Sequence, residues 1–205
     1  MTIAEGKVGV QTLGDGSVNV LTLTKDGSTR MQQSHGRYQE AVLRGNVFFA
    51  CNSASQALSL NSATATGLIL TNPFGSQKNL VLLDVAVALL TAPAGISNLI
   101  LTGTLVPNTT TAVTQTTPLI VRNAMIGNTS ASVGLAASAA TIQATPVIAR
   151  PIGGGPVATG SVTSPFIRDE LSGLLVLVPG TCISLQCLTT AISVIASMTW
   201  EEVSI

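Results

Sequence analysis

Residues 67–106 read GLILTNPFGSQKNLVLLDVAVALLTAPAGISNLILTGTLV, and this stretch decides the fold. It contains three apolar runs, separated by NPFG at residues 72–75 and by APAG at residues 92–95. In residues 81–90 the side chains alternate between two faces. One face holds Val81, Leu83, Val85, Val87 and Leu89, and the other holds Leu82, Asp84, Ala86, Ala88 and Leu90. This alternation predicts a sheet strand with one face of large residues and one face of smaller or polar residues.

Similar apolar runs, two of them within residues 67–106 and the others before and after it, predict an all-β protein. They lie at residues 47–51, 68–72, 99–105, 119–126, 141–149, 174–178, 182–188 and 192–201. About eight strands, with frequent turn residues and almost no helical periodicity, predict an antiparallel β-sandwich, specifically a jelly roll. The Thr-rich residues 107–118 are predicted to be an exposed loop, with an irregular edge strand as the alternative. Residues 150–156, RPIGGGP, are predicted to be a loop because three glycines stand between two prolines.

The distribution of charge predicts two parts, a charged N-terminal arm over residues 1–44 and a sandwich body over residues 45–205. Half of the charged side chains lie in residues 1–44. Asp15-Gly16 and Asp26-Gly27 stand in turns of this arm, and the first of them separates two alternating runs, which is typical of a hairpin. The hairpin pairs either with its own body or with the sheet edge of a neighbouring subunit. A short helical turn is expected within residues 34–46, ending at Gly45.

The body is unusually poor in charge. Charged residues make up 9% of the chain, against about 25% in a typical soluble domain. Residues 85–121, 123–149 and 171–200 contain none. A surface covered by sister subunits accounts for this better than the alternative, a monomer with a Ser/Thr-rich surface. The formal net charge of zero gives no electrostatic footprint for nucleic acid.

Neither a membrane span nor a secretory leader is expected. The longest apolar run is interrupted by Asp84 and is too short to cross a bilayer, and residues 1–20 have no basic region followed by an apolar one. Cys182 and Cys187 are five residues apart in a predicted strand, on opposite faces, so they are not expected to form a disulfide. All three cysteines, including Cys51, are interpreted as small core residues made in a reducing compartment.

No catalytic, metal or cofactor site is predicted. His35, the sole histidine, has no nucleophile motif beside it, and the three cysteines lack zinc-binding spacing. The pairs Asp169-Glu170 and Glu201-Glu202 place adjacent carboxylates on opposite strand faces, which predicts solvated surface positions rather than a catalytic pair. Residues 153–155, GGG, are not followed by Lys-Ser/Thr and do not form a P-loop. The chain is therefore not expected to be an enzyme.

Trp200, the sole tryptophan, has two interpretations: an anchor of the core at the end of the last strand, or an anchor at a subunit contact. The face that contains Asp84 is a candidate subunit contact, because the sequence after Asp84 carries no charge for a long distance. The candidate interface residues are Arg30, Arg37, Tyr38, Arg44, Asp84 and Trp200.

Three stretches resemble small virion proteins of tailed bacteriophages. They are HGRYQEAVLRGNVF at residues 35–48, NPFGSQKNLVLL at residues 72–83 and SMTWEEV at residues 197–203. The resemblance spans about residues 34–90 and 179–203, and the loops between are unmatched. These motifs are structural and carry no chemistry. The resemblance implies a jelly-roll accessory protein of the virion, such as a capsid decoration (cement) protein or the base of a head fibre.

From the resemblance and the charge distribution we expect a homo-oligomer, a dimer or trimer, that binds the major capsid protein on the capsid surface. No cofactor, nucleic acid or membrane partner is expected. The alternative is a tail- or fibre-associated module that binds a host receptor through residues 107–118 and 150–156. The low aromatic content, 3%, speaks against sugar binding in that case.

Overall fold

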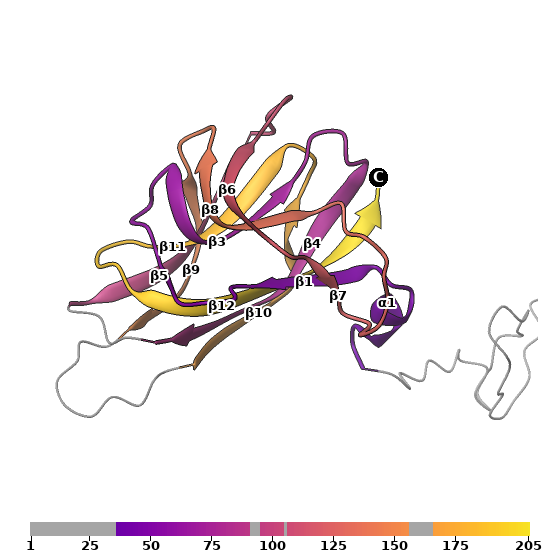
Figure 1. The fold of residues 1–205 in the computed structure, drawn as a ribbon, viewed down its shortest axis with the longest axis horizontal. Helices are drawn as coiled ribbons and strands as arrows, with labels where there is room; N and C mark the ends of the chain where they lie inside the picture. The colour runs from indigo at the N-terminus through magenta and orange to yellow at the C-terminus, as the bar shows by residue number, and fades with distance from the viewer. Residues whose placement is uncertain (1–35, 91–94, 105, 156–165) are drawn as a thin grey trace, which may run out of the picture. The chain divides into compact units, whose positions relative to one another are not determined.

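Alternating apolar side chains build two antiparallel six-stranded sheets, which pack face to face in this computed structural model (Figure 1). The structure describes residues 36–90, 95–104, 106–155 and 166–205, so the predicted hairpin arm lies outside the described residues. Residues 41–205 group into one compact unit, and residues 36–40 belong to a separate one. The prediction of an antiparallel β-sandwich is confirmed, with twelve strand segments in the described residues rather than about eight.

The first sheet has the order β10-β4-β12-β1-β7, with β2 beside β12. Its strands are β1 (Val47–Cys51), β2 (Gln56–Ala57), β4 (Lys78–Leu89), β7 (Arg122–Asn123), β10 (Phe166–Leu177) and β12 (Ser193–Ser204). The second sheet has the order β6-β8-β3-β11-β5-β9. Its strands are β3 (Thr64–Asn72), β5 (Ser97–Gly103), β6 (Val113–Leu119), β8 (Leu135–Ile142), β9 (Val147–Gly155) and β11 (Thr181–Cys187).

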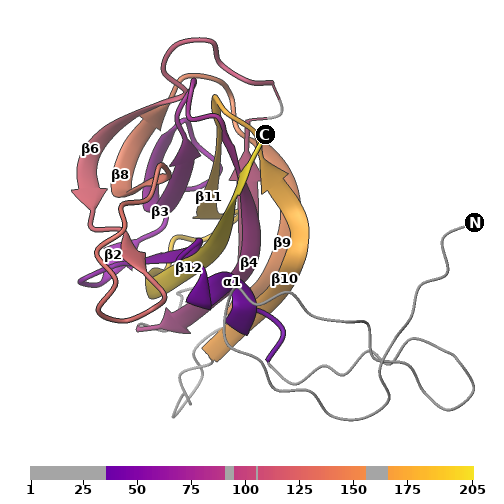
Figure 2. The ribbon, with the colours of Figure 1, turned by 90° about the vertical axis from the view of Figure 1, so that its right-hand side faces the viewer.

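The pairing is nested, because the first half of the body folds back along the second half. β1 pairs with β12, β3 with β11, β4 with β10 and β5 with β9, all antiparallel. Of the remaining strands, β2 lies between β1 and β3, and β6, β7 and β8 belong to the segment between β5 and β9. In that segment, β6 and β8 extend the second sheet beside β3, as Figure 2 shows, and β7 extends the first sheet beside β1.

The core lies between the sheets and consists mainly of aliphatic side chains. Leu68, Leu99 and Leu185 of the second sheet and Leu82 and Trp200 of the first have no exposed surface. They belong to one cluster that spans both sheets. Burying each such side chain contributes about 1.5–3 kcal/mol relative to leaving it in water. The prediction that β12 turns alternate residues inward is confirmed, and Trp200 sits at the buried end of that row.

A bulge at Leu83 changes the predicted faces of β4. Asp84 pairs with Thr199 and Leu82 pairs with Trp200, which leaves Leu83 as an extra residue. A bulge inserts one residue and shifts the alternation by one position. Leu82 is therefore buried in the core and Val81 is only half-buried, so their predicted faces are wrong. Beyond the bulge the prediction holds, since Val85, Val87 and Leu89 are buried.

Three segments between β5 and β10 differ from the prediction. Residues 150–155 belong to strand β9 rather than to a loop, because β9 is an edge strand whose pairing with β5 shifts register beside Pro151. Proline is tolerated at such edges and bulges. The predicted strand at residues 119–126 is wrong: β6 ends at Leu119 and only Arg122–Asn123 pairs. The predicted strand at residues 141–149 is also wrong, because β8 ends at Ile142 and β9 begins at Val147. Of residues 107–118, the second half forms the edge strand β6, as the alternative predicted, and residues 107–112 form a loop.

The expected helical turn is α1 (Gln39–Leu43), and it ends as predicted. The Gly45 N–H donates to the carbonyl of Val42, and the Asn46 N–H donates to the carbonyl of Ala41. Gly45 has a φ of 74°. This pair of bonds, with glycine in the left-handed conformation, is a Schellman cap.

Strand β11 of the second sheet is buried on both sides. Ser184 and Gln186 of β11 point away from the main core as predicted, yet neither has exposed surface. The Gln186 side chain accepts hydrogen bonds from the Ser62 N–H at 2.7 Å and from the Ser59 hydroxyl at 3.1 Å. Cys182, on the same face, joins a second apolar cluster, while Cys187 lies in the main core, so the predicted opposite faces are confirmed.

Candidate interaction surface

The outward side of the first sheet, here called the open face, is a regular surface that no third layer of described strands covers. At Val47 of β1, which points to the same side, this face is buried. All twelve described strands belong to the two sheets, so no third strand layer lies over it. Its centre consists of eight half-buried side chains on β4 and β12: Val81, Asp84, Ala86, Ala88, Ile195, Ser197, Thr199 and Glu201. A solvated face of an antiparallel sheet normally alternates polar residues outward. Here two of the eight residues carry charge.

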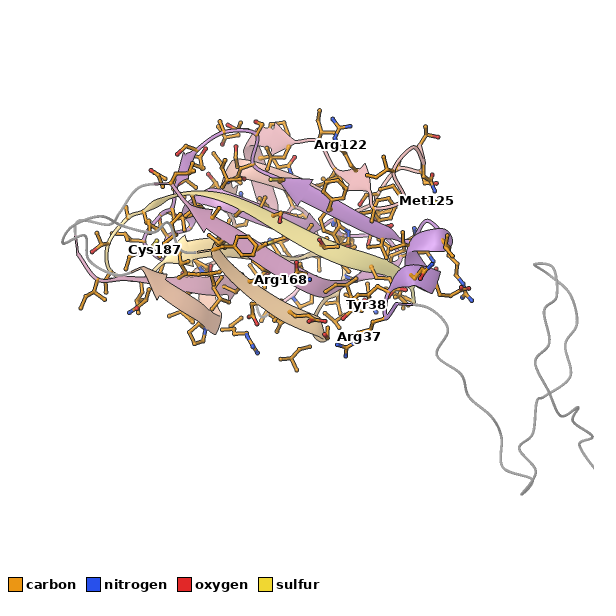
Figure 3. The ribbon with its side chains drawn as sticks, turned by 90° about the horizontal axis from the view of Figure 1, so that it is seen from below. Arg37, Tyr38, Arg122, Met125, Arg168 and Cys187 are labelled. Atoms are coloured by element: carbon orange, nitrogen blue, oxygen red, sulfur yellow. The ribbon has the colours of Figure 1, made fainter. Side chains whose placement is uncertain are left out.

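The rim of the open face is formed by the outer strands. β10 contributes Phe166, Arg168 and Glu170, all exposed. On the other side Phe49 and Cys51 of β1 alternate with the buried Phe48 and Ala50 and therefore point outward, as does Arg122 of β7. Figure 3 shows Arg168 on β10 and Arg122 on β7, with β12 between these strands.

Asp84 lies in the open face, as predicted from the sequence. It accepts a hydrogen bond from Arg168 Nε at 2.8 Å, across the β4–β10 pairing. That hydrogen bond and the charge of Asp84 raise the pKa of the Arg168 guanidinium above its usual value. Because the Arg168 side chain is 59% exposed, water screens the pair and its contribution to stability is small.

Two charges of the open face have no partner. Among the described residues, neither Arg122 nor Glu201 forms an ion pair or a side-chain hydrogen bond. Arg122 pairs in register with Phe49 on β1, and Glu201 pairs with Val47 on the other side of the same strand. Two strand spacings across the sheet and two residues along it, roughly 12 Å in all, separate them. Both positions fall in predicted strands, at residues 119–126 and 192–201, but the sequence does not show which charged residues lack a partner.

A shallow hollow of about 300 Å³ lies beside Arg122 at the rim. Its lining is mainly apolar, with Cys51 and Arg122 as the reactive or charged groups, and it consists of Phe49, Cys51, Ser53, Pro118, Leu119, Ile120 and Arg122. Partial burial raises the pKa of the Cys51 thiol. Cys51 is exposed, so its interpretation as a core residue is wrong. The alternation with Phe48 and Ala50 is the signal that places it outside.

The described residues contain no group of three or more His, Cys, Asp or Glu side chains placed to hold a metal ion. The hollow itself offers one thiol and one guanidinium, without a base beside the thiol.

Glu202 is the most buried charged group of the described body, and its prediction as a solvated surface residue is wrong. Its side chain has no exposed surface. One carboxylate oxygen accepts bonds from the Ser132 hydroxyl at 2.5 Å and from the N–H groups of Val133 at 2.8 Å and Gly134 at 3.2 Å. The other oxygen accepts from Lys78 Nζ at 2.9 Å. These bonds attach β12 to the segment before β8.

The pKa of Glu202 reflects two opposing causes. Burial alone raises it, because a charge is removed from water. The hydrogen bonds from Ser132, Lys78, Gly134 and Val133 together outweigh the burial, so the pKa lies below its usual value. All four bonds come from this chain, so Glu202 is a structural group. The signal in the sequence was its position in the inward row of β12, two residues after Trp200.

The other predicted interface residues lie in different parts of the chain, some of them outside the described residues. Trp200 is fully buried in the core, which supports its interpretation as a core anchor and leaves it no surface for a neighbour. Arg44 is exposed, directly after α1. Arg37 and Tyr38 belong to the other compact unit, where the guanidinium lies 5.6 Å from the ring centroid. Arg30 and His35 lie outside the described residues.

No helix in the described residues is both long and apolar enough to cross a bilayer. Comparison of the chain with models of protein families, with curated proteins and with solved structures gave no match in any of the three.

Proposed function

We propose that this chain is a non-enzymatic structural protein of a bacteriophage virion, which binds the capsid surface as a homo-oligomer and stabilises the shell. The observation that carries this proposal is the open face. It is a regular sheet surface composed largely of Ala, Val, Ile, Ser and Thr, and a second protein surface packs against such a face more favourably than water does. The resemblance in residues 35–48, 72–83 and 197–203 supports the virion assignment.

The remaining surface also supports an assembled protein. Nineteen large apolar side chains are exposed among the described residues, whereas the sequence of residues 41–205 carries ten charged side chains, one of them the buried Glu202. Single exposed apolar residues are ordinary, but so many on a charge-poor body favour association. A lone soluble domain normally keeps charge on its surface for dispersion.

We further infer that the sandwich is a jelly roll. Its support is the nested pairing of β1, β3, β4 and β5 with β12, β11, β10 and β9, because a jelly roll is a double-sheet fold of eight antiparallel strands common in viral capsid domains. On this interpretation β6, β7 and β8 are an insertion between the fourth and fifth strands. The insertion supplies Arg122 and part of the hollow beside it.

The direct test is binding to capsids that lack their decoration. Purified protein is mixed with undecorated capsids of the phage that encodes it, and co-sedimentation and the capsid melting temperature are measured. Binding to the assembled shell alone raises its stability by about 2.7 kcal/mol when the free protein is at a hundred times its dissociation constant. Deletion of residues 1–33 is expected to weaken binding, since the charged arm is proposed to dock onto neighbouring subunits. Absence of co-sedimentation by the full chain contradicts the proposal.

A further inference from the structure

We propose that the open face is a two-fold symmetric interface between two copies of this chain, held by reciprocal ion pairs between Arg122 of one copy and Glu201 of the other. This deepens the homo-oligomer of the proposed function, on which it rests, by naming the surface and the residues that meet. It also fixes the oligomer as a dimer.

Two opposite charges of the body have no partner within the described chain. In residues 41–205, Lys78 pairs with Glu202, Arg168 with Asp84 and Arg150 with Asp169. Arg44 and Glu170 also have interactions within the chain. Arg122 and Glu201 are the charged side chains of these residues that remain without a partner in the described structure. They carry opposite charges and lie on the same face of the same sheet.

The positions of these two charges are compatible with a two-fold axis. Arg122 on β7 and Glu201 on β12 flank β1 on opposite sides, so a two-fold axis can pass between them in the plane of the contact. Rotation about that axis brings Arg122 of one copy opposite Glu201 of the other, and the reverse pair forms at the same time. An interface of this kind is self-complementary by construction. The charges are then complementary in a dimer, although they are too far apart to pair within one chain.

An aromatic side chain lies between the two charges. Phe49 pairs with Arg122 on one side and with Thr199 on the other, and it points outward between the two charges, near the proposed axis. An aromatic side chain close to the centre of an interface is a typical anchor. Toward β4, the small side chains of Ala86 and Ser197 pair in register and leave the face flat. An aromatic side chain near the proposed axis, opposite charges on either side of it and small side chains toward β4 together give the mixed apolar and charged composition of a protein–protein interface.

The test is a charge exchange. Arg122→Glu places two carboxylates opposite each other in each half of the dimer, and Glu201→Arg places two guanidinium groups opposite each other. Either single change is expected to raise the dimer dissociation constant by at least about a hundred-fold, because facing like charges oppose association strongly. The double variant restores opposite charges across the axis and is expected to form a dimer again. Solution mass is measured by light scattering and sedimentation equilibrium over a concentration series.

A matched control introduces the same charge elsewhere. Thr116 lies on β6, an exposed edge strand of the second sheet. The Thr116→Glu variant is expected to leave the dimer intact. Thermal unfolding of each variant confirms that the fold is retained. Cys51 gives an independent readout, since it lies on the open face. Its alkylation is expected to slow as the wild type dimerises, and to remain fast at every concentration in the Arg122→Glu variant.

Several results overturn the interface: a monomeric wild type, a trimer, single variants whose mass is unchanged, or a double variant that stays monomeric. The result of the capsid-binding experiment is interpreted independently of the mass measurements. A wild type that dimerises but does not bind capsids contradicts the proposed function and leaves the interface standing. A wild type that binds capsids while the single variants keep their mass contradicts the interface and leaves the proposed function standing.

Discussion

Replacing Glu202 by glutamine is expected to destabilise the body strongly, although the substitution changes the shape of the side chain very little. The carboxylate accepts four hydrogen bonds, three at one oxygen and one from Lys78 at the other. An amide has one acceptor oxygen, so Glu202→Gln turns an NH₂ group either toward Lys78 or toward the three donors of residues 132–134. In both orientations donors face donors, and the charge-assisted bonds are lost.

The magnitude follows from the burial. Removing one member of a fully buried, hydrogen-bonded charge pair costs about 3–5 kcal/mol. Glu202 has no exposed surface but the Lys78 side chain is 34% exposed and can regain water, so the lower end, about 3 kcal/mol, is expected. For a chain of this size each kcal/mol lowers the melting temperature by about 2–4 °C, so a fall of roughly 6–12 °C is expected. Thermal unfolding followed by circular dichroism measures it. Glu201→Gln is the matched control, since Glu201 is half-exposed and has no partner within the described chain; at a concentration where the chain is monomeric, its effect is expected within about 0.5 kcal/mol.

The same variant gives a pH test with a definite sign. Hydrogen bonding holds the folded-state pKa of Glu202 below its usual value of 4.5. A carboxyl group with a lowered pKa stabilises the fold fully above the unfolded-state pKa, and this contribution is lost as the pH falls through the folded-state pKa. The stability gap between wild type and Glu202→Gln is therefore expected to be constant near neutral pH and to narrow in acid below 4.5. Equal melting temperatures for the Glu202→Gln and Glu201→Gln variants, or a gap that does not change in acid, would refute the reasoning.

Three further outcomes are expected. Gly180→Ala is expected to lower the free energy of unfolding by about 2 kcal/mol or more, because Gly180 has a φ of 85° and an added Cβ collides with the Asn108 carbonyl oxygen. Urea unfolding measures this change, and an unchanged midpoint contradicts the prediction. Alkylation of the native protein is expected to modify Cys51 alone, with the two buried cysteines reacting after denaturation, as mass spectrometry of the intact chain can show; more than one adduct on native protein would be inconsistent with their burial. Asp84→Asn is expected to cost less than about 1 kcal/mol in the monomer, because its partner Arg168 is largely exposed, and a larger loss in chemical denaturation would show that the pair is less screened than its exposure indicates.

The sequence was sufficient to predict the sandwich, because alternation over long runs has one physical cause. β12 shows it best: the inward row from Val194 to Trp200 is buried as the alternation predicts. Periodicity failed where the register shifts. The bulge at Leu83 adds one residue between two regular halves of β4, and the sequence on both sides is equally apolar, so composition gives no sign of the shift.

The segment between β5 and β9 was predicted poorly for a different reason. β6 and β9 are edge strands and pair on one side. An edge strand tolerates Pro118 and Pro151, which in a central strand would remove a hydrogen bond of the ladder. Residues that signal a loop in a central position therefore do not exclude a strand at an edge. The partner of an edge strand is set by tertiary contacts, and local patterns do not contain them.

Only part of the open face could be predicted from the sequence. Asp84 was identified from its position in a run without other charges, and it does lie on that face. Arg122 and Glu201 were not, because their importance rests on which charges lack a partner, and partners follow from strand order. Lys78 and Glu202 lie far apart in the sequence and meet through the β4–β12 pairing. A list of charged residues cannot separate paired from unpaired ones until that pairing is known.

The nested pairing also has a consequence for how the chain folds during synthesis. Val47 of β1 pairs with Glu201 of β12, so the two strands are separated by nearly the whole body. Closing so long a loop is entropically costly, and folds dominated by distant pairings form slowly. On the ribosome β4 also lacks its neighbour β12 until the last strand has emerged. We therefore expect the first sheet to assemble after translation of residues 193–204, with its apolar strands open to chaperones until then.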